Sequence, residues 1–331
     1  AAEETFLIGG DYNVIPEPID AEFPDNWRRD ALFQPDTRAA YRRLVDRQIR
    51  GGIDGLVPVG TTGEAPTLTA AEREACVAIA VEAAPAPGRP GDRVPAIAGT
   101  GTNDPDASIA ATRRAATLGA DAALIVAPYY NRPDQRMLEA HFRAIADEGG
   151  LPIVVYNVPG RTGTNVEADT FLRLAEHPRV VAVKEASANL EQIAVICRDR
   201  PRDVAVLSGD DAATLAVLAM GGDGAISVAS NQVPGEMAAL CAAALGGDWA
   251  TARAVHERWL PLMRANFQGA PNPVPAKAAL VAMGVLERDA LRRPLLPLDD
   301  GPRARLTTLL GDLGLLDGAV LGAGAPAEAV A

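Results

Sequence analysis

The chain is poor in the residues that build metal sites and disulfide frameworks. Its 331 residues include three cysteines and three histidines. Cys76, Cys197 and Cys241 lie far apart without a C-x-x-C pair, a pattern typical of reduced thiols in a cytoplasmic protein rather than of disulfides or a zinc site. The three histidines fall in predicted helices, which argues against an imidazole-bound metal at strand ends. We therefore expect a cytoplasmic protein without a metal.

Long apolar runs and basic patches are also missing. No uninterrupted apolar stretch reaches the roughly 18 residues that span a bilayer, and residues 1–4 carry none of the positive charge that opens a secretory signal. The chain has 43 acidic against 31 basic residues, a formal net charge of −12. So acidic a protein repels nucleic-acid phosphates and anionic membranes. We expect neither nucleic acid nor a membrane among its partners.

Apolar residues, in contrast, make up 48% of the chain, which is enough to bury a core. Seven short, almost wholly apolar runs alternate with helix-length segments, a pattern typical of parallel strands covered on both faces. The runs are residues 55–59, 94–98, 122–127, 153–156, 180–183, 204–207 and 225–228. Seven such units, with an eighth strand needed upstream, favour a (β/α)8 TIM barrel over a doubly wound α/β sheet.

The two ends of the chain do not follow this alternation. Residues 1–45 are rich in proline, aspartate and aromatic residues and contain no typical first barrel strand. We therefore expect the barrel over residues 46–246. Residues 247–317 predict a C-terminal helical domain that packs on the barrel or on a partner subunit. Residues 318–331 are rich in alanine and glycine and predict a flexible tail.

Lys184 directly follows the apolar run 180–183, which places its amine at the end of a buried strand. The carboxyl ends of the strands carry the active site in TIM barrels. Burial there disfavours the charged ammonium and favours the neutral amine that attacks a ketone to form a Schiff base. The same residue alone also fits a lysine that reaches solvent or pairs with Glu185.

Other polar residues follow neighbouring strands. Tyr156 ends the preceding strand and Thr61 follows the first of the seven runs, so their hydroxyls could relay the protons that imine chemistry requires. Each also fits a structural role, as a rim hydrogen bond or a helix cap. Arg161 offers a planar fork for a carboxylate, although a surface arginine is the commoner case. Asp210 and Asp211 fit a solvated helix N-terminus better than a cation site.

Six segments, in order and spacing, resemble the dihydrodipicolinate synthase and N-acetylneuraminate lyase family of pyruvate-dependent class I aldolases. They are GTTGE at 60–64, YYNRP at 129–133, YNVPGRTG at 156–163, KEAS at 184–187, SGDD at 208–211 and GGDGAISVASN at 221–231. The resemblance covers residues 40–315. It implies a TIM barrel with a C-terminal helical domain and a homo-oligomer, either a tetramer or a dimer.

The resemblance also implies catalytic roles. Lys184 forms the Schiff base with pyruvate, while Tyr156 and Thr61 belong to a proton relay that Tyr130 completes from a neighbouring subunit. Because the imine itself activates the substrate, no cofactor is expected.

Substrate-binding roles are implied in the same way. Thr62 holds pyruvate together with the backbone near Gly209 and Ile226, and Arg161 takes the place of the arginine that grips the carboxylate of aspartate semialdehyde in the synthase branch. The implied reaction condenses pyruvate with L-aspartate 4-semialdehyde to 4-hydroxy-tetrahydrodipicolinate, on the diaminopimelate route to lysine. Two alternatives stay open: a sugar-acid aldolase or lyase of the same family, and an inactive barrel that serves as a binding protein.

The N-terminal segment departs from the family, whose members begin with a strand that ends in Thr-Pro. Residues 7–44 instead resemble an internal piece of the exonuclease III family. In that family the Asp and Asn that correspond to Asp11 and Asn13 serve a metal-dependent site. The other groups that such a site needs are missing, so we expect no nuclease activity. Residues 6–9 or 12–15 are the candidates for the strand that closes the barrel.

Overall fold

The computed structural model describes residues 35–83 and 94–316. The predictions for Asp11, Asn13, the first barrel strand and the C-terminal tail therefore lie outside the described residues. Among the described helices, none combines the length and apolar character needed to cross a bilayer.

One parallel sheet forms the centre of the molecule, and its strands are neighbours in the order of the sequence. The strands are β1 (Ile97–Gly99), β2 (Ala122–Val126), β3 (Ile153–Asn157), β4 (Val180–Glu185), β5 (Ala205–Ser208) and β6 (Gly224–Ala225). The run at 55–59 lies beside β1, because Leu56 bridges Ala96 and the Gly99 amide donates to the Pro58 carbonyl over 2.9 Å. All seven predicted runs thus reach the sheet, although the last is a shorter strand than predicted. A doubly wound sheet reverses its strand order, and these strands do not.

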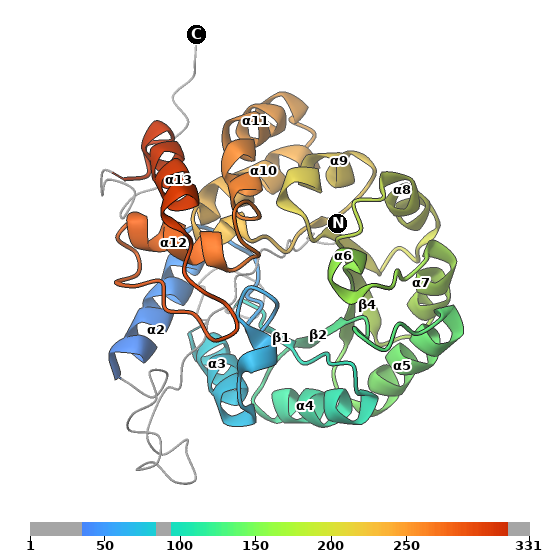
Figure 1. Cartoon of the computed structure of the whole chain (residues 1–331). Coiled ribbons are helices and arrows are strands. Elements are labelled where there is room, and N and C mark those ends of the chain that lie inside the picture. The colour runs from blue at the N-terminus through green and yellow to red at the C-terminus, as the bar shows by residue number, and fades with distance from the viewer. Residues whose placement is uncertain (1–34, 84–93, 317–331) are drawn as a thin grey trace.

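Helices surround the strands, as Figure 1 shows. Those that follow the chain around the sheet are α2 (Pro35–Arg50), α3 (Ala70–Glu82), α4 (Pro105–Thr117), α5 (Gln135–Glu148), α7 (Ala168–Ala175), α8 (Leu190–Asp199), α9 (Thr214–Ala219) and α10 (Pro234–Leu245). Side chains cap two of these helices at the N-terminus: Thr69 and Glu72 form a capping box on α3, and Asp104 caps α4.

Three more helices follow the sheet: α11 (Trp249–Ala265), α12 (Val274–Ala282) and α13 (Asp300–Asp312). The first of them packs on α10, and α13 contacts both α11 and α12. The loop between α11 and α12 returns to the strand ends, where it contacts the turn that contains Thr62.

Each strand contributes to two cores because successive side chains point to opposite faces. On β3, Ile153 and Val155 pack outward in the large core beneath the helices. Val154 and Tyr156 point the other way, into a smaller core that also contains Leu124 from β2 and residues from the other strands. A sheet with its own apolar core on the inner face is curled, and this inner core supports the strand ends where polar residues gather.

A close backbone contact fixes the turn that follows residues 55–59. Val59 adopts a left-handed φ of 62°, which is strained for a β-branched residue. A Cβ added to Gly99 would lie 2.0 Å from the Val59 carbonyl oxygen. Glycine at 99 therefore allows the Val59 turn to pass over the end of β1, and this fixes the start of the turn that carries Thr61 and Thr62.

We expect Gly99→Ala to lower the free energy of unfolding by about 1–3 kcal/mol, because the added carbon meets backbone that cannot move aside. Urea unfolding measures the change. Gly160→Ala is the control, since nothing lies within 4 Å of a Cβ built there. Equal stability of the two variants would contradict the role of this close contact.

Candidate active site

Lys184 and Tyr156 are register partners on β4 and β3. Both side chains are buried, at 8% and 5% exposed, and the Lys184 Nζ lies 4.3 Å from the centroid of the Tyr156 ring. The inner face of the curled sheet thus shelters an amine and a phenol side by side. This is the arrangement that the sequence predicted for a Schiff-base lysine and its proton-relay partner.

Glu185 points to the other face of β4 and does not pair with Lys184. Its carboxylate accepts hydrogen bonds from the Ser187 amide over 2.8 Å, from Gln192 Nε2 over 3.1 Å and from Asn157 Nδ2 over 3.1 Å. Burial raises the pKa of Glu185 despite these donors. The alternative interpretation of Lys184 as the ion-pair partner of Glu185 is therefore wrong, because strand alternation separates the two side chains.

Asn157 and Glu185 are also register partners, one residue further along β3 and β4 than Tyr156 and Lys184. Asn157 Oδ1 also accepts from the Val166 amide over 2.9 Å. The sequence interpretation missed this polar cluster behind the candidate site. A polar residue directly after each of the two predicted site residues was the only available signal.

Gly209 lies directly against the stem of Lys184. A Cβ added there would stand 3.0 Å from Lys184 Cγ and 3.2 Å from Lys184 Cε. The Gly209 amide donates to the Glu185 carbonyl over 2.7 Å, and the Ile226 amide donates to the Ser208 carbonyl over 2.8 Å. The backbone at Gly209 is therefore fixed beside β4, which carries the lysine, and the backbone at Ile226 is fixed beside β5.

The C-terminal region contributes a residue that the sequence interpretation did not identify. Asn272, between α11 and α12, donates from Nδ2 to Thr62 Oγ1 over 2.9 Å. Its carbonyl oxygen accepts from Arg161 Nη2 over 3.2 Å. Arg161 belongs to the short helix α6 (Pro159–Thr162) that follows β3. The structure thus brings Thr62 and Arg161 together through a third residue, while Thr61 lies in the same turn as Thr62.

Charged contacts hold the C-terminal region against the turn that follows Thr62. Glu64 is 3% exposed, forms an ion pair with Lys277 of α12 and accepts from the Arg292 amide over 2.7 Å. The Arg292 guanidinium pairs in turn with Glu72 of α3. These contacts join residues more than 200 positions apart, which is why no local pattern predicted them.

Two predicted residues stand apart from this cluster. Tyr130 is 91% exposed, with a left-handed φ of 72°, and so this chain alone does not bring it to Lys184. Asp211 is buried, and its Oδ2 accepts from the Val228 and Ala229 amides over 3.0 and 2.8 Å. Burial raises the pKa of Asp211. The prediction of a solvated helix N-terminus holds for Asp210, which caps Ala212, but is wrong for Asp211.

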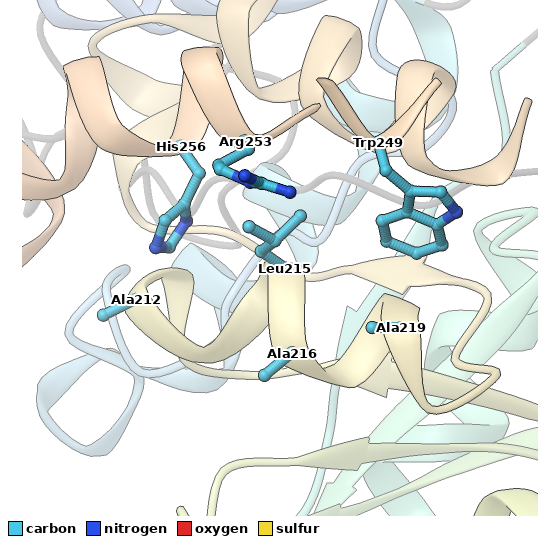
Figure 2. Close-up of a pocket in the computed structure, with 7 residues that line it drawn as sticks. All are labelled: Ala212, Leu215, Ala216, Ala219, Trp249, Arg253 and His256. Atoms are coloured by element: carbon cyan, nitrogen blue, oxygen red, sulfur yellow. The ribbon is translucent and has the colours of Figure 1, made fainter. Parts of the chain in front are cut away.

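A separate cavity of about 410 Å³ lies between α9 and α11 (Figure 2). Its lining is Ala212, Leu215, Ala216, Ala219, Trp249, Arg253 and His256. Lys184, Tyr156 and Gly209 are not among the residues that line this cavity. We therefore assign the candidate active site to the strand ends around Lys184 and not to the cavity.

Comparisons with known proteins show the family of the chain. The model of the dihydrodipicolinate synthetase family matches residues 36–312. The chain is 48% identical over 284 residues to 4-hydroxy-tetrahydrodipicolinate synthase of Koribacter versatilis, covering 86% of this chain and 92% of the relative. It is 48% identical over 278 residues to the synthase of the same name from Salinibacter ruber, covering 83% and 89%.

Solved structures show the same likeness. Dihydrodipicolinate synthase from Thermotoga maritima has a TM-score of 0.83 at 38% identity and covers 94% of this chain and 100% of its own. The enzyme from Aquifex aeolicus has a TM-score of 0.82 at 34% identity, covering 95% and 99%. The family model matches most of this chain, and Lys184 and Tyr156 lie side by side at the strand ends. The chain therefore belongs to the dihydrodipicolinate synthetase family.

Proposed function

We propose that the protein is a lyase of the 4-hydroxy-tetrahydrodipicolinate synthase type, which condenses pyruvate with L-aspartate 4-semialdehyde. The observation that carries the proposal is the sheltered Lys184 amine, 4.3 Å from the centre of the Tyr156 ring. A buried amine with a phenol beside it suits imine formation with a keto acid. The names of the relatives at 48% identity support the choice of substrates.

The Lys184 amine attacks the C2 carbonyl of pyruvate, and loss of water from the carbinolamine gives the imine. Loss of a methyl proton then gives an enamine, whose carbon adds to the aldehyde. The amine of the second substrate attacks the imine carbon and displaces Lys184, which closes the ring and restores the free lysine. Overall, the two substrates give 4-hydroxy-tetrahydrodipicolinate and one water. Each step moves a proton, and this is the work proposed for Tyr156 and Thr61.

Binding of the two substrates is divided between two groups of residues. Thr62 and the backbone near Gly209 and Ile226 hold the pyruvate carboxylate. Arg161 holds the carboxylate of the semialdehyde, for which its planar fork is suited. The carbonyl of Asn272 fixes one guanidinium nitrogen of Arg161 over 3.2 Å and leaves other N–H donors for a substrate. This favours the synthase over the alternative of a sugar-acid lyase.

The relay is completed by a second copy of the chain. Tyr130 is 91% exposed in this chain, so its phenol is accessible to a second subunit. We therefore include a homo-oligomer, a dimer or tetramer, in the proposal.

The proposed architecture is a closed TIM barrel. Seven segments in sequential parallel order support it, and the candidates for the closing strand, residues 6–9 and 12–15, lie outside the described residues. We place the enzyme in the cytoplasm, in line with three cysteines that form no disulfide.

Borohydride reduction in the presence of pyruvate tests the chemistry directly. The chain contains two lysines, Lys184 and Lys277. Reduction should add to Lys184 the mass of pyruvic acid less one oxygen atom, as read by peptide mass spectrometry. Lys184→Arg should abolish the adduct and the activity, whereas Lys277→Arg should keep the adduct. Labelling of Lys277 alone, or of neither lysine, would overturn the proposal.

Arg161→Ala should separate the two half-reactions. Without its guanidinium the semialdehyde carboxylate loses a charged hydrogen bond, so condensation should fall by about 100-fold while the pyruvate adduct on Lys184 still forms. A coupled assay of condensation and mass spectrometry of the adduct measure the two effects. Arg202→Ala, an exposed arginine on a turn, is the control and should change neither. Equal loss of both half-reactions would show that Arg161 has another role.

A further inference from the structure

Asn272 has a position that its local sequence does not explain. The residue is 4% exposed and lies in a loop 210 positions after Thr62, to which it donates a 2.9 Å hydrogen bond. Its Oδ1 atom is buried without a hydrogen-bond partner among the described residues. A buried unpaired carbonyl destabilises a fold, so the placement of this amide calls for an explanation other than stability.

The direction of the hydrogen bond determines what Thr62 can do. A threonine hydroxyl has one proton to donate and two lone pairs that accept. The Asn272 amide nitrogen occupies a lone pair and cannot take the proton. The Thr62 proton therefore stays available for an acceptor on the substrate side, such as the carboxylate of pyruvate.

The backbone of the same residue acts on the other substrate-binding side chain. The Asn272 carbonyl accepts from Arg161 Nη2 over 3.2 Å, and this contact does not depend on the identity of the side chain at 272. One residue of the C-terminal region thus contacts the proposed pyruvate-binding threonine through its side chain and the proposed semialdehyde-binding arginine through its backbone.

We propose that Asn272 is a positioning residue that orients the Thr62 hydroxyl as a donor to the pyruvate carboxylate and, through its carbonyl, sets the place of Arg161. The proposal deepens the proposed function and rests on it. The two parts of Asn272 then affect different substrates. Its side chain affects the binding of pyruvate through Thr62, and its backbone carbonyl affects the binding of the semialdehyde through Arg161. Asn272 itself contacts neither reacting centre and so is not a catalytic residue.

The test is steady-state kinetics of Asn272→Ala. We expect the KM for pyruvate to rise about tenfold, the effect of losing an oriented hydrogen bond to a charged group. The KM for the semialdehyde should change less than about threefold, because the backbone carbonyl remains. Asp248→Ala is the control for stability: it removes the N-cap of α11, at the opposite end of that helix from the loop with Asn272, and should leave both KM values unchanged.

A double-mutant cycle with Thr62→Val distinguishes positioning from a general loss of structure. If Asn272 acts through the Thr62 hydroxyl, adding Asn272→Ala to Thr62→Val should raise the pyruvate KM no further. Multiplication of the two effects, or an equal rise of both KM values, would overturn the proposal.

Where Asn272→Ala does not fold, as judged by circular dichroism, Asn272→Asp replaces it, with the same comparison of the two KM values. The carboxylate of the new aspartate side chain accepts the Thr62 proton. Asn272→Asp should therefore raise the pyruvate KM by more than the tenfold expected of Asn272→Ala.

The two proposals can fail separately. A pyruvate adduct on Lys184 of the unmodified chain, together with an unchanged pyruvate KM in Asn272→Ala, refutes the role of Asn272 alone. Absence of the adduct in the unmodified chain refutes the proposed function and with it this inference.

Discussion

The parallel register between β3 and β4 is the constraint on which the candidate site depends. It sets Tyr156 opposite Lys184 on the inner face and Asn157 opposite Glu185 on the outer face. Because strand side chains alternate, one register places an amine and a phenol in the inner core and a hydrogen-bonded amide and carboxyl behind them. A slip of β4 by one residue would break both pairs, because Lys184 would turn to the outer face and point toward the helices.

The inner core and its rim place different demands on the sequence. Inside the curled sheet, apolar residues such as Leu124 and Val154 fill the space and exclude water from beneath the lysine. At the rim, positions are fixed by backbone contacts that admit little substitution, as Gly99 shows against Val59 and Gly209 against the stem of Lys184. Glycine thus occupies two strand-end positions at which an added Cβ would meet a neighbouring segment.

Much of this arrangement could be predicted from the sequence because it is local. An apolar run followed at once by Lys184 predicts a buried strand with an amine at its end, and the capping box at Thr69 is a pattern four residues long. The bonds of Asn272 to Thr62 and Arg161 could not be predicted, since they join segments separated by 210 and 111 positions respectively. Asp211 shows the opposite error, in which a typical surface pattern is buried by elements from elsewhere in the chain.

The loop between α11 and α12 joins the C-terminal helices to the strand ends. We therefore expect the sheet and these helices to be inherited together. Exchange of everything after residue 246 between distant relatives would replace Asn272 and Lys277 together with their surroundings, while Thr62 and Glu64 kept the geometry of the other parent. Recombination at that boundary, which follows the end of the last strand, therefore cuts through a network and not between modules. A single crossover keeps both sides of these contacts from one parent only where it falls before Thr62 or after Lys277.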